Sequence, residues 1–270
     1  MEEKHDYINL ASLRSSWSEG LLILMYHSIE TPPLKHKWRG LYVEPSKLRS
    51  QLKELKASGA RFVSLSEWSR ARTRQRQVVV TFDDGMRSVF LRALPILQEL
   101  AVPSINYIVA DLIGQTNQWD HANGGQSRPL MSRSEIEDWL RAGQEIGSHT
   151  LTHPDLTTLS LTEARREIFD SKKKLEDLFQ RPVRHFCHPY NKSNAAVRDL
   201  VIEAGYETAC PRLGGYNFPE TDIFALNRHL ARHWRPYMVA YVRFLQKRLL
   251  KSLFRSRSPT EVRVDKVFPP

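Results

Sequence analysis

The sequence predicts an α/β fold in which helices cover the outside of a mainly parallel β-sheet. First, short apolar runs typical of buried strands alternate along the chain with segments whose apolar residues recur at helical spacing. Second, polar clusters directly follow three of the predicted strands, and strand ends of this kind carry the chemistry in parallel α/β folds. A chain of 270 residues is long enough for one α/β barrel or for two small domains.

The individual elements follow from these patterns in chain order. The predicted strands are 20–26, 61–65, 77–82, 104–110, 145–148, 183–188 and 206–209. The predicted helices are 46–58, 88–100, 132–143, 160–178 and 193–204. Gly59 ends the first helix, and Pro95 is expected to kink or split the second. Ser132 and Ser160 each precede a Glu by three residues, which is the spacing of a capping box.

The excess positive charge is confined to the C-terminal part of the chain. The chain carries 40 Lys and Arg against 30 Asp and Glu, and residues 223–260 hold nine of the basic residues and no acidic one. We expect an N-terminal extension (1–19), a main domain (20–235) and a basic amphipathic tail (236–270). Such a tail either contacts an anionic membrane surface or docks on the protein with its basic face in water. No nucleic-acid partner is expected, because no binding motif accompanies the charge.

The sequence favours a cytoplasmic location. The N-terminal residues begin with acidic side chains and lack the basic-then-apolar pattern of a signal peptide. The apolar run Leu21–Tyr26 is far too short to cross a bilayer. Two cysteines, Cys187 and Cys210, fit a reducing compartment. We therefore expect a cytoplasmic protein, and membrane contact by its tail would be at the inner face of the membrane.

Two adjacent carboxylates follow the predicted strand 77–82. Asp83 and Asp84 precede Gly85, and because Asp and Gly also form turns, a plain turn is one interpretation. Adjacent carboxylates behind a buried strand repel one another unless a cation or a shared proton offsets their charge. A divalent metal would provide that offset, with one Asp as its ligand and the other as a base.

Two pairs of histidines are separated by three residues. His149 and His153 follow a predicted strand and precede Pro154, which places them on a turn. His229 and His233 stand among arginines, an unfavourable field for a bound cation, so that pair is expected to be structural or at the surface. With one Asp, the first pair makes a ligand set suited to Zn²⁺, Co²⁺, Mn²⁺ or Ni²⁺.

The order and spacing of these motifs resemble those of polysaccharide deacetylases, the NodB-homology or carbohydrate esterase 4 family. The resemblance runs from about Leu22 to Arg228 and includes LMYH, TFDDG, SHTLTHPDL and the His-Pro-Tyr segment. The Tyr-His element and the ending Leu-Asn-Arg are most similar to the poly-N-acetylglucosamine deacetylase branch. The resemblance implies a distorted (β/α) barrel that hydrolyses an N-acyl group, acetyl or formyl, from an amino sugar in a polysaccharide or a lipid-linked glycan intermediate.

The resemblance also implies a role for each residue of the site. Asp84, His149 and His153 would hold one divalent metal ion, with Zn²⁺ expected and Co²⁺, Mn²⁺ or Ni²⁺ as alternatives. Asp83 would be the general base that activates water. The backbone N–H of Tyr190 would help to hold the oxyanion, with the metal as Lewis acid.

Two positions depart from the family pattern. Cys187 stands where many members have an arginine that orients the base. Where the family has a histidine after Leu-x, this chain has Arg228 and then His229. His229 is therefore expected to be the general acid, slightly displaced, with His27 and His188 as the other candidates.

Three residues are expected to contact substrate: His27, His188 and Trp119. Trp119 lies in a loop rich in Gly and Asn, where its ring either stacks on a sugar or belongs to a plain surface loop. The departures motivate a second hypothesis, a catalytically inactive protein that keeps the fold and binds a sugar or a membrane surface. A phosphoesterase-like metal hydrolase is a third hypothesis, but the sequence has no glycine-rich phosphate cradle to support it.

Overall fold

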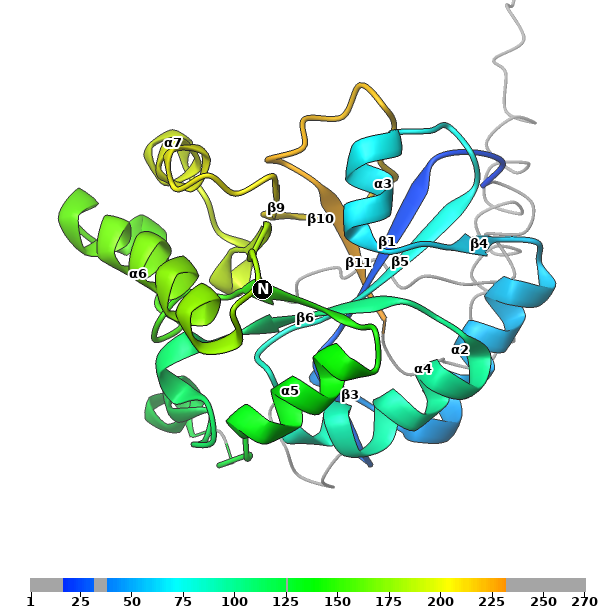
Figure 1. Cartoon of the computed structure of the whole chain (residues 1–270), viewed down its shortest axis with the longest axis horizontal. Coiled ribbons are helices and arrows are strands. Elements are labelled where there is room, and N and C mark those ends of the chain that lie inside the picture. Colours follow the sequence, from blue (N-terminus) through cyan, green and yellow to red (C-terminus); the bar gives the residue numbers. More distant parts are fainter. Residues whose placement is uncertain (1–16, 32–37, 125, 232–270) are drawn as a thin grey trace, which may run out of the picture. The chain divides into compact units, whose positions relative to one another are not determined.

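The computed structural model describes residues 17–31, 38–124 and 126–231 (Figure 1). The predictions for the basic tail (236–270), for His233 and for most of the N-terminal extension concern residues outside these ranges. Among the helices that the structure describes, none is both long enough and apolar enough to cross a membrane.

A mainly parallel β-sheet forms the centre of the fold. Its strands are β1 (Leu21–Tyr26), β4 (Arg61–Phe62), β5 (Gln77–Phe82), β6 (Ser104–Ile108), β7 (Glu145–Ser148), β8 (His185–Cys187), β9 (Thr208–Cys210), β10 (Arg212–Leu213) and β11 (Asn227–Leu230). They lie in the order β10-β11-β1-β5-β6-β7-β8-β9, with β4 paired to β5. A separate parallel pair joins β2 (Ser28–Ile29) to β3 (Tyr42–Val43). The order brings β11, near the C-terminal end of the described residues, beside β1.

The two ends of the sheet meet and nearly close it into a barrel. The N–H of Ala209 in β9 donates to Ile223 O at 2.8 Å, and its carbonyl accepts from Leu226 N at 3.0 Å, just ahead of β11. All residues of β1 and β5 are buried, as expected for parallel strands that are covered on both faces. The structure therefore confirms the predicted α/β class and its parallel sheet.

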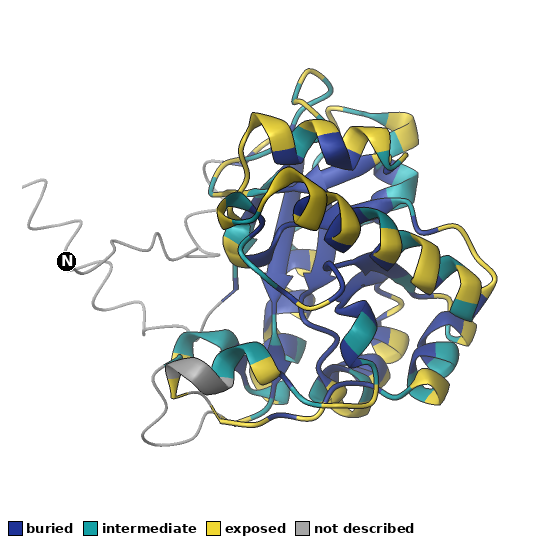
Figure 2. Ribbon diagram, turned by 90° about the vertical axis from the view of Figure 1, so that its left-hand side faces the viewer, coloured by how far each residue is buried: buried dark blue, intermediate teal, exposed yellow. Residues whose placement is uncertain are grey.

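Helices cover the outside of this sheet. They are α2 (Pro45–Ala57), α3 (Leu65–Ala71), α4 (Leu94–Leu100), α5 (Arg133–Arg141), α6 (Leu161–Phe179) and α7 (Ala195–Glu203). Figure 2 shows buried strands behind helices whose outer faces are exposed. Both predicted capping boxes form, one between Ser132 and Glu135 and the other between Ser160 and Glu163.

The predicted helix over 88–100 is split, as expected. A π-helical turn over Val89–Ala93 leads into α4, and Pro95 lies in the first turn of α4. Proline cannot donate a hydrogen bond to the preceding turn, and the change from π-helical to α-helical geometry falls directly before it. Short 3₁₀ turns occupy several loops: Arg39–Leu41, Ala110–Leu112, Gln118–Asn123, Leu156–Thr158 and Pro189–Asn191.

Two local predictions need correction. The strand predicted over 61–65 ends at Phe62, because the side chain of Ser64 accepts a hydrogen bond from Glu67 N and begins helix α3. Strand β11 is absent from the prediction, because its Asn-Arg-His-Leu sequence has no apolar run to indicate a buried strand.

Candidate metal centre and active site

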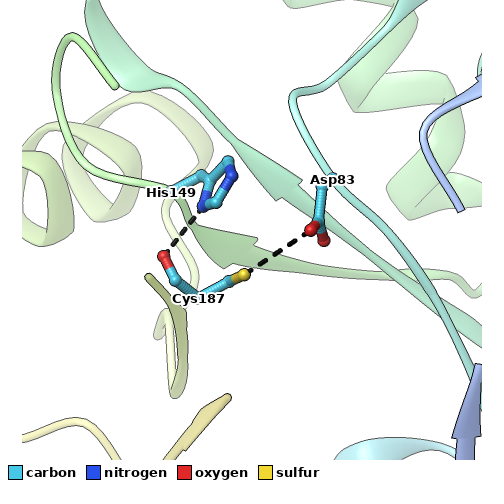
Figure 3. Close-up of side chains that lie close together, drawn as sticks. All are labelled: Asp83, His149 and Cys187. Carbon is cyan, nitrogen blue, oxygen red and sulfur yellow. Dashed lines mark hydrogen bonds between the residues drawn. The ribbon is translucent and has the colours of Figure 1, made fainter. Parts of the chain in front are cut away.

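The predicted polar clusters lie at the carboxyl ends of strands that are neighbours in the barrel. Asp83 follows β5, His149 follows β7, and β8 ends at Cys187. Because the strands from β5 to β8 are parallel, their carboxyl ends open at the same edge of the sheet. Figure 3 shows the three side chains pointing toward one another from these strand ends.

The backbone after β5 turns sharply and sends the two adjacent carboxylates to different partners. Asp84 and Gly85 have φ angles of 75° and 70°, in the left-handed region. Asp is one of the few non-glycine residues that adopts this conformation at low cost. At Gly85 a Cβ atom would lie 3.2 Å from Ile108 Cδ1, which leaves little room for a side chain.

Asp84 faces the two predicted histidines. Its Oδ1 atom lies 3.5 Å from His149 Nε2 and 3.4 Å from His153 Nε2, and all three side chains are buried. Donor atoms that share a metal at about 2.0–2.2 Å lie roughly 3.0–3.5 Å apart, so these atoms fit one ion. His149 Nδ1 donates to the carbonyl of Cys187 at 2.8 Å, which leaves Nε2 free to bind a metal. The structure thus brings together a candidate Asp-His-His metal site.

The electrostatics of this cluster suit metal ligands. Burial raises the pKa of Asp84, but the contacts from His149 and His153 outweigh burial and hold the pKa well below its usual range. Burial lowers the pKa of His153, against the opposing effect of Asp84. An ionised carboxylate and a neutral imidazole are the protonation states in which these groups bind metals.

Asp83 is held by a buried arginine from the far end of the described chain. Arg228 in β11 donates from Nη1 to Asp83 Oδ1 at 2.7 Å and from Nη2 to Oδ2 at 2.9 Å. Nη2 also donates to Asn191 Oδ1 at 2.9 Å, so the guanidinium is itself fixed. Burial raises the pKa of Asp83, but the charge of Arg228, followed by His27 and His149, keeps the pKa below its usual range. Asp83 is therefore ionised at neutral pH.

A second group, Asp83, His149 and Cys187, also has the spacing of a metal site (Figure 3). Cys187 Sγ lies 3.7 Å from Asp83 Oδ2. Burial raises the pKa of the Cys187 thiol well above its usual value, and Arg228 already engages both oxygens of Asp83. A metal at this place would need a thiolate and a displaced arginine. The group around Asp84 is the better fit.

Among the three candidate acids, the structure brings His27 to the base. His27 Nε2 lies 3.9 Å from Asp83 Oδ2. Burial lowers the pKa of His27, against the opposing charges of the carboxylates. His229 is directed elsewhere: successive residues of a strand face opposite sides, so Arg228 reaches Asp83 while His229 Nε2 donates to Gly215 O at 2.7 Å. His229 was expected to be the general acid; its side chain is directed away from Asp83, and His27 is the candidate that lies next to the base.

The other predicted residues border the cluster or lie behind it. Trp119 stacks on His153, with ring centroids 4.4 Å apart and planes inclined by 20°. Tyr190 lies edge-on to the same imidazole at 4.8 Å, and its side chain is 49% exposed. His188 is buried edge-on against Phe186, and burial lowers its pKa to about 3. Trp119 and Tyr190 thus flank a candidate metal ligand, whereas His188 packs into the core.

The sequence prediction missed the roles of Arg228 and Asn191. The sequence held one indication of the role of Arg228. Cys187 stands where many family members have an arginine, so a buried carboxylate base in this chain needs a cation from another position. Arg228 itself occupies the second position that differs from the family pattern, where many members have a histidine. Only the pairing of β11 with β1 shows that this arginine enters the barrel at Asp83.

Comparison with known proteins agrees with this geometry. The sequence profile described as polysaccharide deacetylase matches residues 70–209, more than half of the chain. The chain belongs to the polysaccharide deacetylase family. The matched segment contains Asp83, Asp84, His149 and His153. Membership confirms the resemblance predicted from the sequence, and it confirms the predicted enzyme class, hydrolases of non-peptide carbon–nitrogen bonds.

Individual members resemble the chain over most of its length. A poly-beta-1,6-N-acetyl-D-glucosamine N-deacetylase of Staphylococcus aureus is 23% identical over 217 residues, which cover 71% of each chain. The crystal structure of a polysaccharide deacetylase from Bacillus cereus has a TM-score of 0.67 at 24% identity and covers 80% of this chain and 66% of that one. The Streptococcus pyogenes deacetylase PplD, in complex with acetate, has a TM-score of 0.66 at 22% identity and covers 82% and 97%. These likenesses confirm the (β/α) barrel of the polysaccharide deacetylase type.

Proposed function

We propose that this protein is a metal-dependent hydrolase that removes an N-acetyl group from an amino sugar of a glycan. The observation that carries the proposal is that two adjacent carboxylates have different partners: Asp84 faces two histidines and Asp83 faces Arg228. Asp84, His149 and His153 would hold the ion, which supplies Lewis-acid polarisation of the acyl group and of water when bound. Zn²⁺ suits this donor set, with Co²⁺, Mn²⁺ and Ni²⁺ as alternatives.

Asp83 is the general base in this proposal. Its carboxylate is ionised and almost fully buried, and the guanidinium of Arg228 fixes both of its oxygens. Asp83 takes a proton from the water that adds to the acyl carbon. The backbone N–H of Tyr190 is the proposed donor to the resulting oxyanion, as the family pattern implies.

His27 completes the proton transfer. The bond between the acyl carbon and the sugar nitrogen breaks, and the nitrogen must gain a proton to leave as an amine. His27 Nε2 lies 3.9 Å from Asp83 Oδ2. In this proposal the two groups approach to hydrogen-bond distance, and the proton taken up by Asp83 passes through His27 to the sugar nitrogen. The products are acetate and the free amino sugar, and Asp83 returns to its ionised state.

The substrate class follows from the flanking rings and from the family. Trp119 and Tyr190 contact the ring of His153, and aromatic rings beside a site are suited to packing against a sugar. The Staphylococcus aureus relative, named for poly-β-1,6-N-acetylglucosamine, supports an N-acetylglucosamine unit. We propose a lipid-linked or nucleotide-linked intermediate as the carrier of that unit.

The alternative of an inactive binding protein loses its main argument. That hypothesis rested on the missing arginine beside Asp83 and on an uncertain acid. Arg228 supplies the cation from β11, and His27 lies beside the base. No observation in the described residues favours a phosphate-binding site over the acyl-sugar site.

The test is release of acetate or formate from a panel of N-acylated sugars. The panel contains β-1,6-linked N-acetylglucosamine oligomers, a lipid-linked N-acetyl sugar, a nucleotide-linked N-acetyl sugar and an N-formylated sugar. We expect release by the wild type, its loss on chelation, and its return with Zn²⁺. His149→Ala should release nothing, whereas His229→Ala, matched in residue type but outside the site, should act like the wild type. No release by the folded, Zn²⁺-loaded wild type on any sugar would contradict the proposal.

A further inference from the structure

A buried carboxylate outside the site holds the loop that carries both histidine ligands. Glu167 lies in α6 and is 5% exposed. Its Oε2 atom accepts hydrogen bonds from Leu151 N at 2.8 Å and from Thr152 N at 3.0 Å. Its Oε1 atom accepts a hydrogen bond from Thr152 Oγ1 at 2.7 Å. Burying a carboxylate is costly without such donors, so Glu167 and this loop stabilise one another.

The loop needs this support because its backbone is strained. Thr150 and His153 have φ angles of 70° and 68°. A left-handed conformation costs of order 1–3 kcal/mol at a non-glycine residue and is rare for a β-branched one. Such a conformation persists only where surrounding contacts fix it. The N–H of His153 is held within the loop by Thr150 Oγ1 at 3.0 Å, and Glu167 holds the N–H groups of the two residues between them.

The carbonyl side of the same loop is held by backbone contacts. Ala110 N donates to Thr150 O at 3.0 Å, and Asp111 N donates to Leu151 O at 2.9 Å. The loop is therefore fixed between the segment that follows β6 and the side chain of Glu167. The contacts from Glu167 come from another element, so a change of this one side chain removes them and leaves the loop's own sequence and these backbone contacts in place.

We propose that Glu167 is a positioning residue for the metal site. It holds the turn between His149 and His153 so that both Nε2 atoms stay next to Asp84 Oδ1. This inference rests on the proposed metal site. Groups that orient metal ligands change metal affinity by about 10- to 100-fold when they are removed. Glu167 makes its hydrogen bonds to Leu151 and Thr152 and not to a ligand side chain. It would therefore act on metal affinity through the position of the loop that carries the ligands.

The test is a titration of the full chain with Co²⁺ alone, in which visible absorption reports the binding of the ion. Glu167→Ala removes all three hydrogen bonds and is expected to weaken Co²⁺ binding by about 10- to 100-fold. Glu167→Gln should bind nearly as tightly as the wild type. Its amide oxygen can still accept from Leu151 N and Thr152 N, while its NH₂ donates to Thr152 Oγ1. Wild-type affinity in Glu167→Ala would overturn the proposal.

Glu176 offers a matched control on the same helix. Its Oε1 atom accepts from Lys172 Nζ and from Val183 N, both at 2.9 Å, and so it anchors a loop without a ligand. Glu176→Ala is expected to lower the unfolding temperature and to leave the Co²⁺ affinity unchanged. An equal loss of Co²⁺ affinity in Glu176→Ala would show a general effect of stability and contradict the positioning role.

Two further outcomes separate this inference from the proposed function. If Glu167→Ala does not fold, Glu167→Asp keeps the charge but withdraws the carboxylate by one methylene. Full Co²⁺ affinity in Glu167→Asp would then overturn the inference. A wild-type chain that binds no Co²⁺ would instead overturn the proposed metal site itself.

Discussion

Asp83 and Asp84 are neighbours in the chain but lie in opposite surroundings. Asp83 faces a guanidinium that donates to both of its oxygens. Asp84 faces two imidazoles, whose Nε2 atoms lie 3.5 and 3.4 Å from its Oδ1. Burial raises the pKa of both carboxyls, and both pKa values are nevertheless lowered, by Arg228 at Asp83 and by the histidines at Asp84.

The difference shows how two adjacent carboxylates can take separate roles. A guanidinium keeps its proton and binds no metal, so it holds Asp83 ionised and available as a base. A neutral imidazole can share a metal with a carboxylate, so Asp84 is suited to be a ligand. The left-handed turn at Asp84, with φ of 75°, is what directs the two side chains to these different partners.

The largest effect on turnover is expected from the loss of a histidine next to Asp84. His153→Ala leaves two of the three ligand side chains, and loss of the Lewis-acid contribution, of several kcal/mol, should lower turnover by about 10³-fold or more. Acetate release and bound Zn²⁺ per chain are the measurements. Turnover that stays at the wild-type level with stoichiometric Zn²⁺ would contradict the assigned ligand set.

A change of Arg228, the partner of Asp83, should lower turnover less and should leave metal binding intact. Arg228→Lys keeps a positive charge but cannot give two parallel N–H donors to Asp83. We expect kcat to fall about 100-fold through misplacement of the base, while Co²⁺ affinity stays at the wild-type value. A rise in KM with unchanged kcat would show that Arg228 acts on substrate binding and not on the base.

The pH dependence sharpens the same comparison. Only the ionised form of Asp83 can act as a base, and its lowered pKa keeps that form present at neutral pH; activity falls as pH drops through the pKa. In Arg228→Gln the carboxyl loses its cation while burial still raises its pKa. The acid limb of kcat/KM should therefore move to higher pH than in the wild type. The measurement is kcat/KM against pH at saturating Zn²⁺, and an unmoved acid limb would contradict the role of Arg228.

The smallest effect is expected at Cys187. Its thiol is a weak donor 3.7 Å from Asp83 Oδ2, and the bond to His149 Nδ1 comes from its backbone carbonyl, which a substitution keeps. Cys187→Ala should change acetate release by less than about threefold, which is under 1 kcal/mol. Loss of Co²⁺ binding in this variant would instead place the metal between Asp83, His149 and Cys187.

Local patterns were enough to predict most strands of the barrel, the two capping boxes and the residues that meet in the candidate metal site. Asp83 and Asp84 belong to one short segment after an apolar strand, and His149 and His153 belong to another. Because parallel strands place such segments at one edge, proximity follows from the fold class alone. The roles of these residues still came from the resemblance to a family.

The partners of the base could not be predicted in the same way. Arg228 and His229 are adjacent in a short strand with no apolar pattern, and a shift of one residue decides which of them faces Asp83. That choice is set by the pairing of β11 with β1, between segments about 200 residues apart. The role of Glu167 likewise depends on how α6 packs on the loop after β7.

The most direct test compares Asp83→Asn with Asp84→Asn in one assay of Co²⁺ affinity and acetate release. We predict that Asp83→Asn binds Co²⁺ as tightly as the wild type while turnover falls by about 10²- to 10⁴-fold, the usual contribution of a general base. Asp84→Asn should lose both Co²⁺ affinity and turnover. Loss of Co²⁺ binding in Asp83→Asn, or wild-type turnover in that variant, would contradict the separation of roles between the two carboxylates.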